Sequence, residues 1–203
     1  RQRARLGSPG SDRAIPVAVL VDETYRAVAH LPWLLTLRNT RSWPEGIWEF
    51  DGGGRYLGHS GGGGMGYGPG ALLGGGLAAR DRGDFAVGIV GDGDLLFAPG
   101  ALWSAVHHRV PMLVVVNNNR TYLNDEEHQR HIAGVRGRVG AHAAVGTAID
   151  DPEVDFAALG RSLGAWAVGP VAHPDDLRTA LAAAVGHVLD GEVAVVDVRT
   201  EKS

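Results

Sequence analysis

The sequence predicts an α/β fold: a doubly wound parallel sheet in three layers, with helices on both faces. Short apolar runs rich in Val and Ile alternate along the chain with stretches of helical pattern, and this alternation is typical of parallel βαβ units. The runs are apolar at nearly every position, as strands buried on both faces are. A length of 203 residues suits one domain with a substantial core.

The elements are predicted in chain order from these patterns. Five apolar runs are the expected strands: Ile15–Val21, Phe85–Val90, Met112–Val116, Ala165–Val168 and Val193–Val198. Helical patterns cover Glu23–Leu35 (broken at Pro32), Met65–Arg80, Leu102–His108, Asp155–Gly164 and Pro174–Leu189. We expect irregular structure over Trp43–Gly58 and a polar loop with one helix over 120–147.

The first 13 residues differ from the rest. They contain four Arg and one Asp and have no hydrophobic periodicity, which predicts a flexible basic tail or linker over 1–13. The domain itself is expected to span 14–203.

Composition narrows the classes of function. No segment approaches the ~18 consecutive apolar residues of a membrane span, and a formal charge of −4 with dispersed Arg argues against a nucleic-acid surface. The chain contains no cysteine, which excludes disulfides, thiolate nucleophiles and sulfur-ligated metals. Because no apolar block of a secretory signal follows the first residues, we expect a cytoplasmic protein.

Glycine is the compositional anomaly. The chain has 31 glycines, about twice the usual ~7%, without a collagen period. Many of them fall between Gly52 and Gly100, which indicates that they serve particular positions.

Polar residues follow two of the predicted strands. Asp92 comes after the strand that begins at Phe85, and Asn119 after the strand that begins at Met112. The carboxyl ends of neighbouring parallel strands share one edge of a sheet, where ligands bind. A carboxylate and an amide oxygen are hard ligands suited to Mg²⁺ or Ca²⁺, and a diphosphate would complete the charge. Gly91 and Gly93 on either side of Asp92 would let the backbone approach such a ligand closely.

Two segments resemble one known family. GDGDLLFAPGALWSAVHHRVPMLVVVNNNRTY (residues 91–122) resembles the diphosphate- and metal-binding motif of thiamine diphosphate (ThDP) enzymes, and SGGGGMGYGPGALLGGGLA (60–78) resembles their upstream Gly-rich segment. The similarity extends over roughly residues 15–200 and is nearest to the acetolactate synthase and benzoylformate decarboxylase branch. It implies the ThDP-binding fold and identifies the chain as the C-terminal diphosphate-binding (PP) domain.

The resemblance implies roles for particular residues at the metal end of the cofactor. The side chains of Asp92 and Asn119 and the backbone carbonyl of Thr121 would hold Mg²⁺. Diphosphate contacts are expected from Gly91, Gly93, Asp94, Tyr122 and Arg26.

Further roles are implied at the ring end. Met65 would wedge between the two rings of the cofactor and force its bent conformation. The Met65 amide and the Gly63 carbonyl would bond to the pyrimidine. The catalytic residues of this chain are not identified by the resemblance, because the activating glutamate of the family lies on a separate domain.

Two residues depart from the family pattern. Asp94 stands where Ser or Ala is usual, and a second carboxylate beside a diphosphate is repulsive unless it turns away. Arg120 stands where a small residue is usual, and its charge could offset that of Asp94.

The implied function is the ThDP- and Mg²⁺-binding half of a 2-oxo acid decarboxylase or carboligase. Its partner would be a pyrimidine-binding (PYR) domain or subunit in a hetero- or homo-oligomer, and its substrate a small 2-oxo acid. The chain would then be a C-terminal fragment or one subunit of a split enzyme. The alternative is a catalytically silent cofactor-binding or scaffold subunit.

Other patterns leave alternatives open. Asp92 and Asp94 also spell the D-x-D of a nucleotide-sugar transferase. Glu127, His128 and His131 have a helical spacing that could bind zinc, although a solvated helix face is the simpler interpretation. Further minor candidates are His107 and His108 at a helix end, and His59 and Ser60 near a substrate.

Overall fold

The computed structural model describes residues 14–202 except 41–42, 52, 59–60 and 63. The predicted tail 1–13 and the candidates His59, Ser60 and Gly63 lie outside the described residues. Within them, one sheet of five parallel strands has the order β1-β2-β3-β5-β4. The strands are β1 (Trp33–Arg38), β2 (Phe85–Gly91), β3 (Met112–Asn118), β4 (Trp166–Val171) and β5 (Val193–Arg199).

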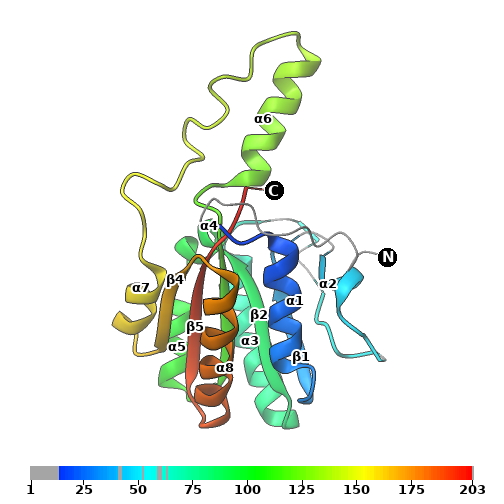
Figure 1. The fold of residues 1–203 in the computed structure, drawn as a ribbon, viewed down its shortest axis with the longest axis vertical. Helices are drawn as coiled ribbons and strands as arrows, with labels where there is room; N and C mark the ends of the chain where they lie inside the picture. Colours follow the sequence, from blue (N-terminus) through cyan, green and yellow to red (C-terminus); the bar gives the residue numbers. More distant parts are fainter. Residues whose placement is uncertain (1–13, 41–42, 52, 59–60, 63, 203) are drawn as a thin grey trace.

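Helices cover both faces of the sheet, so the predicted three-layer arrangement is confirmed (Figure 1). On one face, α1 (Val17–Val28), α2 (Trp43–Ile47) and α8 (Pro174–Leu189) pack over a core that includes Leu113 and Val115. On the other face, α3 (Tyr67–Arg82), α4 (Asp92–Phe97), α5 (Gly100–His107) and α7 (Phe156–Ser162) pack over a core that includes Met112, Val114 and Val116. Consecutive residues of β3 thus enter opposite cores, which explains why its sequence is apolar without interruption.

The prediction was wrong at the start of the domain. Ile15–Val21 was expected to be a strand, but α1 begins at Val17, and Ile15 makes only an isolated bridge to Thr200. Val17, Leu20, Val21 and Val28 are buried with helical spacing. The β-branched residues favoured a strand, but burial of one helical face outweighs that propensity.

The prediction of a helix over Glu23–Leu35 was wrong in its second half. The helix ends at Val28, and Trp33–Arg38 forms β1 at the edge of the sheet. Its first five residues are buried. Apolar and polar residues do not alternate along β1, because α1 and α3 cover its two faces. Periodicity therefore could not distinguish the short run WLLTLR from a helix segment.

The region 43–58, expected to be irregular, contains the short helix α2 and an aromatic cluster. Trp48 donates from Nε1 to the Val21 carbonyl at 3.0 Å. Its ring stacks on Tyr25 at 5.3 Å and meets Trp33 edge-on at 5.1 Å. These contacts fix the segment over α1 and β1.

Helix α3 packs unusually close to the sheet. A Cβ added at Gly75 would lie 2.6 Å from Thr36 Cγ2, and one at Gly68 would lie 2.0 Å from Asp94 Oδ2. Both distances are shorter than any real contact, so these glycines are required by packing.

Residues Leu123–Val135 form α6, which projects beyond the carboxyl edge of the sheet and is followed by a long return segment, 136–153 (Figure 1). We call the two together the arm. Only Glu126 of α6 is buried. In the part of the chain that the structure describes, no helix is both long and apolar enough to cross a membrane.

Candidate functional site

A cavity of about 370 Å³ opens at the carboxyl edge, where β1, β2 and β3 end. The structure brings most of the predicted site residues to its wall: Met65, Gly91, Asp92, Gly93, Asp94, Asn119, Thr121 and Tyr122. The expected meeting of Asp92 and Asn119 at one edge is therefore found.

Asp92 is the first residue of α4 and is only 2% exposed. Its Oδ1 accepts from the Gly93 N–H at 2.8 Å, and its Oδ2 accepts from the Arg120 N–H at 2.6 Å. Burial raises the pKa of Asp92 to about 6, although these amide bonds act in the opposite direction. The negative charge of a carboxylate in this position is poorly compensated, and a bound cation would stabilise it.

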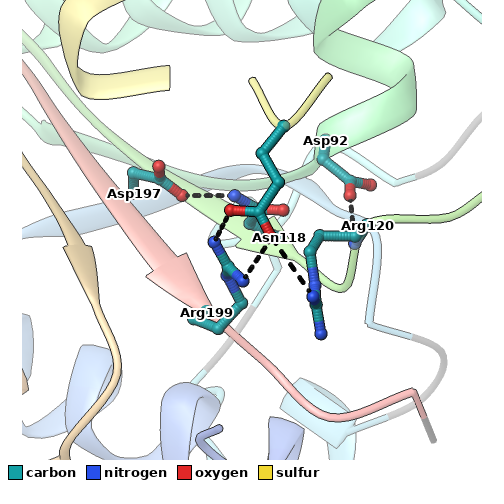
Figure 2. A network of polar contacts seen from close by, with 6 residues as sticks. Asp92, Asn118, Arg120, Asp197 and Arg199 are labelled. Atoms are coloured by element: carbon teal, nitrogen blue, oxygen red, sulfur yellow. Dashed lines mark hydrogen bonds and ion pairs between the residues drawn. The ribbon is translucent and has the colours of Figure 1, made fainter. Parts of the chain in front are cut away.

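The three asparagines at the carboxyl end of β3 make different contacts. Asn117 accepts from Thr200 Oγ1 at 2.6 Å and donates to the Asn39 carbonyl at 3.2 Å. Asn118 points to the other side and donates to Asp197 Oδ1 at 2.9 Å (Figure 2). Asn119 lies past the strand and lines the cavity, where its Oδ1 accepts from the Thr121 N–H at 3.1 Å.

Thr121 is fixed by its neighbours in the arm. Its Oγ1 lies 2.9 Å from Glu126 Oε2 and 3.1 Å from the Thr147 carbonyl. Thr121 forms an isolated antiparallel bridge with Ala148, whose two backbone bonds use the Tyr122 N–H and the Arg120 carbonyl. The Thr121 carbonyl is not used in this bridge, which is compatible with its predicted role as a ligand.

Asp94 turns away from Asp92. Its Oδ1 accepts from the Gly66 N–H at 2.5 Å, and its Oδ2 accepts from Asn39 Nδ2 at 2.9 Å. The guanidinium of Arg120 does not offset Asp94, because it pairs with Glu153 at 3.3 Å. The Asp94 carboxylate is therefore accommodated because it turns away, and not because Arg120 neutralises its charge. This arrangement also disfavours a D-x-D metal site.

Tyr122 and Met65 form walls of the cavity. The Tyr122 ring lies over Gly93, where an added Cβ would be 2.3 Å from Cε1. The ring meets Phe97 edge-on at 6.1 Å. Met65 is 43% exposed at the rim.

Of the predicted site residues that the structure describes, Arg26 is the one that lies away from the cavity. It lies in the last turn of α1, which leads into the amino-terminal end of β1, at the opposite end of the sheet (Figure 1). Its Nε pairs with Asp22 at 2.8 Å, and its side chain is 60% exposed. The prediction of Arg26 was based on the family resemblance alone, and the structure places this residue away from the cavity.

The zinc interpretation of residues 127–131 gains no support. Within the described residues, no group of three His, Asp or Glu side chains is placed to hold a metal. The candidate metal site depends instead on one carboxylate with amide and carbonyl oxygens.

Sequence reasoning missed several residues of the cavity wall, including Val17, Asn39, Thr40 and Trp43. Asn39 follows β1 directly, as Asp92 follows β2. The same signal, a polar residue at a strand end, would have found it if β1 had been predicted.

Comparison with known proteins identifies the family. A family model described as the thiamine pyrophosphate enzyme, C-terminal TPP binding domain, matches residues 39–198. Benzoylformate decarboxylase of Pseudomonas aeruginosa is 36% identical over 106 residues, which are 52% of this chain and 18% of that protein.

Solved structures give the same fold. A ThDP-dependent 4-hydroxybenzoylformate decarboxylase of Rhodococcus jostii RHA1 matches with a TM-score of 0.76 at 24% identity, over 96% of this chain and 34% of that one. Benzoylformate decarboxylase of Polynucleobacter necessarius matches with a TM-score of 0.73 at 19% identity, over 96% and 35%. The chain therefore spans about a third of the length of these enzymes. Because the family model matches most of its residues, the chain belongs to the thiamine pyrophosphate enzymes and is a C-terminal TPP-binding domain of that family.

Proposed function

We propose that this domain binds thiamine diphosphate with Mg²⁺ in the cavity at the carboxyl edge and forms one half of the active site of a 2-oxo acid decarboxylase or carboligase. The observation that carries the proposal is the buried, poorly compensated Asp92 carboxylate, which shares the cavity with Asn119 and Thr121. One anionic and several neutral oxygens are the donor set that Mg²⁺ takes together with a diphosphate.

Each residue of this chain would have a defined task. Asp92, the amide oxygen of Asn119 and the carbonyl of Thr121 would hold the metal. The amides of Asp94 and Gly93 would bond to the diphosphate, for which the Gly93 N–H would exchange its bond to Asp92 Oδ1. Tyr122 covers Gly93 and excludes water from that side. Met65, on the cavity wall, supports the rings. When bound, thiamine diphosphate supplies a nucleophilic carbon and an electron sink for cleavage of the bond beside the keto group.

The proposal requires a second protein surface. Met65 and Tyr67 on the cavity rim are 43% and 45% exposed, and a PYR domain or subunit with the activating glutamate would lie against this rim. We propose that it completes the site in a hetero- or homo-oligomer. The relatives of known activity suggest a substrate such as benzoylformate.

Isothermal titration calorimetry with ThDP tests the site. We expect the protein to bind ThDP only when Mg²⁺ is present. Asp92→Ala should weaken this binding by more than ~100-fold, since loss of an outer-shell partner alone typically costs 10–100-fold. Asp81→Ala removes an exposed carboxylate of α3 that is paired with Arg80 and should leave binding unchanged. Equal affinity of Asp92→Ala and wild type would show that the metal lies elsewhere.

The competing function is a catalytically silent binding subunit. Two features favour it: the Asp94 carboxylate, and the activating glutamate that the family carries on a separate domain. The Asp94 carboxylate, however, is turned away onto Gly66 and Asn39. Adding a PYR-bearing partner and measuring CO₂ release from benzoylformate and other small 2-oxo acids separates the two. Binding of ThDP without any turnover in that complex would favour the silent subunit.

A further inference from the structure

Arg120 lies between two of the expected metal ligands, Asn119 and Thr121, and its φ is 61°. Residues with a Cβ rarely adopt this left-handed conformation, which persists only where surrounding contacts hold it. It directs the Arg120 N–H to Asp92 Oδ2 at 2.6 Å. The same turn lets the Thr121 N–H donate to Asn119 Oδ1 at 3.1 Å. The orientation of both side chains expected to hold the metal therefore depends on one strained residue.

The side chain of Arg120 is held by Glu153, at the end of the arm. Arg120 Nη1 lies 3.3 Å from Glu153 Oε1, while Arg199 of β5 donates to both Glu153 oxygens at 3.2 and 3.0 Å. Figure 2 shows the guanidinium groups of Arg120 and Arg199 reaching the same carboxylate. The two-pronged contact with Arg199 is the stronger kind of charge-assisted bond, and the Arg199 side chain is only 17% exposed. Glu153 thus ties the metal-binding turn to the end of β5.

Backbone bonds hold the two sides of the turn. The Ile149 N–H donates to the Arg120 carbonyl at 2.8 Å, and the Tyr122 N–H donates to the Thr147 carbonyl at 2.9 Å. Glu153 is not among the residues that line the cavity. Its side chain is linked to the metal-binding turn through its hydrogen bond to Arg120.

We propose that Glu153 is a positioning residue for the metal site: it holds the Arg120 guanidinium and so stabilises the left-handed turn that aims the residue-120 amide at Asp92. The inference rests on the proposed function, because the metal in question is that of the thiamine diphosphate site. Glycine adopts a positive φ without strain. The need for Glu153 is consequently tied to the arginine at position 120 and disappears when glycine replaces it.

A double-mutant cycle tests this coupling. The proteins are wild type, Glu153→Gln, Arg120→Gly and the double variant, with Asp51→Asn as control because it removes an exposed carboxylate paired with Arg55. The first readout is hydrogen exchange of the residue-120 amide in the metal-free protein, followed by NMR. The second is the affinity for Mg²⁺ in the presence of ThDP, measured by calorimetry.

We expect Glu153→Gln to speed exchange of that amide and to weaken Mg²⁺ binding by about 10-fold, as outer-shell substitutions do. In the Arg120→Gly background, the same substitution should change neither readout, and Asp51→Asn should behave as wild type. An equal effect of Glu153→Gln in both backgrounds, or none in either, would overturn the inference. If wild type binds no Mg²⁺ with ThDP, the proposed function fails, whereas the exchange data on the metal-free protein still decide the role of Glu153.

Discussion

At the scale of single residues, two buried carboxylates repel each other: one lies on the cavity wall and the other in the strand β5. Asp92 follows β2 and Asp197 belongs to β5, and they are 2% and 0% exposed. Burial is the main cause that raises the pKa of each to about 6. Ionisation of these two carboxyl groups therefore lowers the folding stability. Such perturbed carboxyl groups are common at ligand-binding sites.

Asp197 gives a test of that cost through pH. Its pKa is about 6 in the folded protein and near 3.8 when unfolded, so the folded state binds the proton more tightly. Stability from this group is present below pH 4 and is lost as pH rises to about 6, by roughly 3 kcal/mol. Asp197→Asn cannot ionise. Its stability relative to wild type should therefore rise by 2–3 kcal/mol, as an order-of-magnitude value, between pH 4 and pH 7.

Urea unfolding of the metal-free proteins at several pH values measures this difference. Asp51→Asn serves as the control of opposite sign, because Arg55 lowers the pKa of the exposed Asp51 carboxyl. A pH-independent difference between Asp197→Asn and wild type would contradict the assigned shift.

Single residues also show how far the site could be predicted. Asp92 and Asn119 follow strands whose apolar runs are unmistakable, so their meeting at one edge followed from topology alone. The partners of Asn117 and Asn118 could not be foreseen, because Thr200 and Asp197 lie about 80 positions away, at sequence separations of 83 and 79. The left-handed backbone conformation of Arg120 could not be predicted either, since nothing in the local sequence distinguishes it from an ordinary loop arginine.

At the scale of elements, α3 explains much of the glycine content. Gly75 faces Thr36 of β1 at a distance that leaves no room for a methyl group, whereas a Cβ added at the adjacent Gly74 would meet no atom within 4 Å. The two neighbours therefore form a matched pair on one helix.

We expect Gly75→Ala and Gly74→Ala to have opposite effects. Gly75→Ala should destabilise the fold by about 1–3 kcal/mol through overpacking. Gly74→Ala should stabilise it by roughly 0.5–1 kcal/mol, because alanine favours the helix. Thermal and urea unfolding measure both. If both variants are stabilised, α3 does not pack as closely on β1 as the structure indicates.

Elements were predictable where pattern and length agreed. Helix α8 has the predicted bounds, Pro174–Leu189, since Pro174 at its start and Asp175 and Asp176 in its first turn are typical of a helix N-terminus. The central strands β2, β3 and β5 were found from their apolar runs. The prediction of β1 failed because Trp33–Arg38 is short, buried and close to a proline, so the local sequence favoured the end of a broken helix. Tertiary burial on both faces decides such a segment.

At the scale of the whole molecule, the arm stands apart from the two cores. Val135, Val139 and Val145 are 72%, 87% and 73% exposed, and neither core includes a residue of α6. The arm is attached chiefly where Thr121 and Tyr122 pair with residues 147–148.

Among the residues that the structure describes, limited trypsin digestion should therefore cut within the arm first. We expect early cleavage after Arg136 and Arg138, which are exposed, because segments with few buried contacts open most readily. The two products should stay together on gel filtration, since β4, β5, α7 and α8 remain packed on the rest of the sheet. Mass spectrometry identifies the cut sites. Earlier cleavage at Arg80 in α3 would contradict this order of local stability.

The Asp94 carboxylate also sets the separation of two walls of the cavity. Asp94 lies in the first turn of α4, which begins with Asp92, and it accepts a hydrogen bond from the N–H of Gly66, the residue next to Met65. The wall expected to meet the rings of a ligand is thereby tied to the wall expected to meet its phosphates. The distance between these two walls is thus set, and a ligand that contacts both must be long enough to span it. Thiamine without its diphosphate would contact only the wall expected to meet the rings.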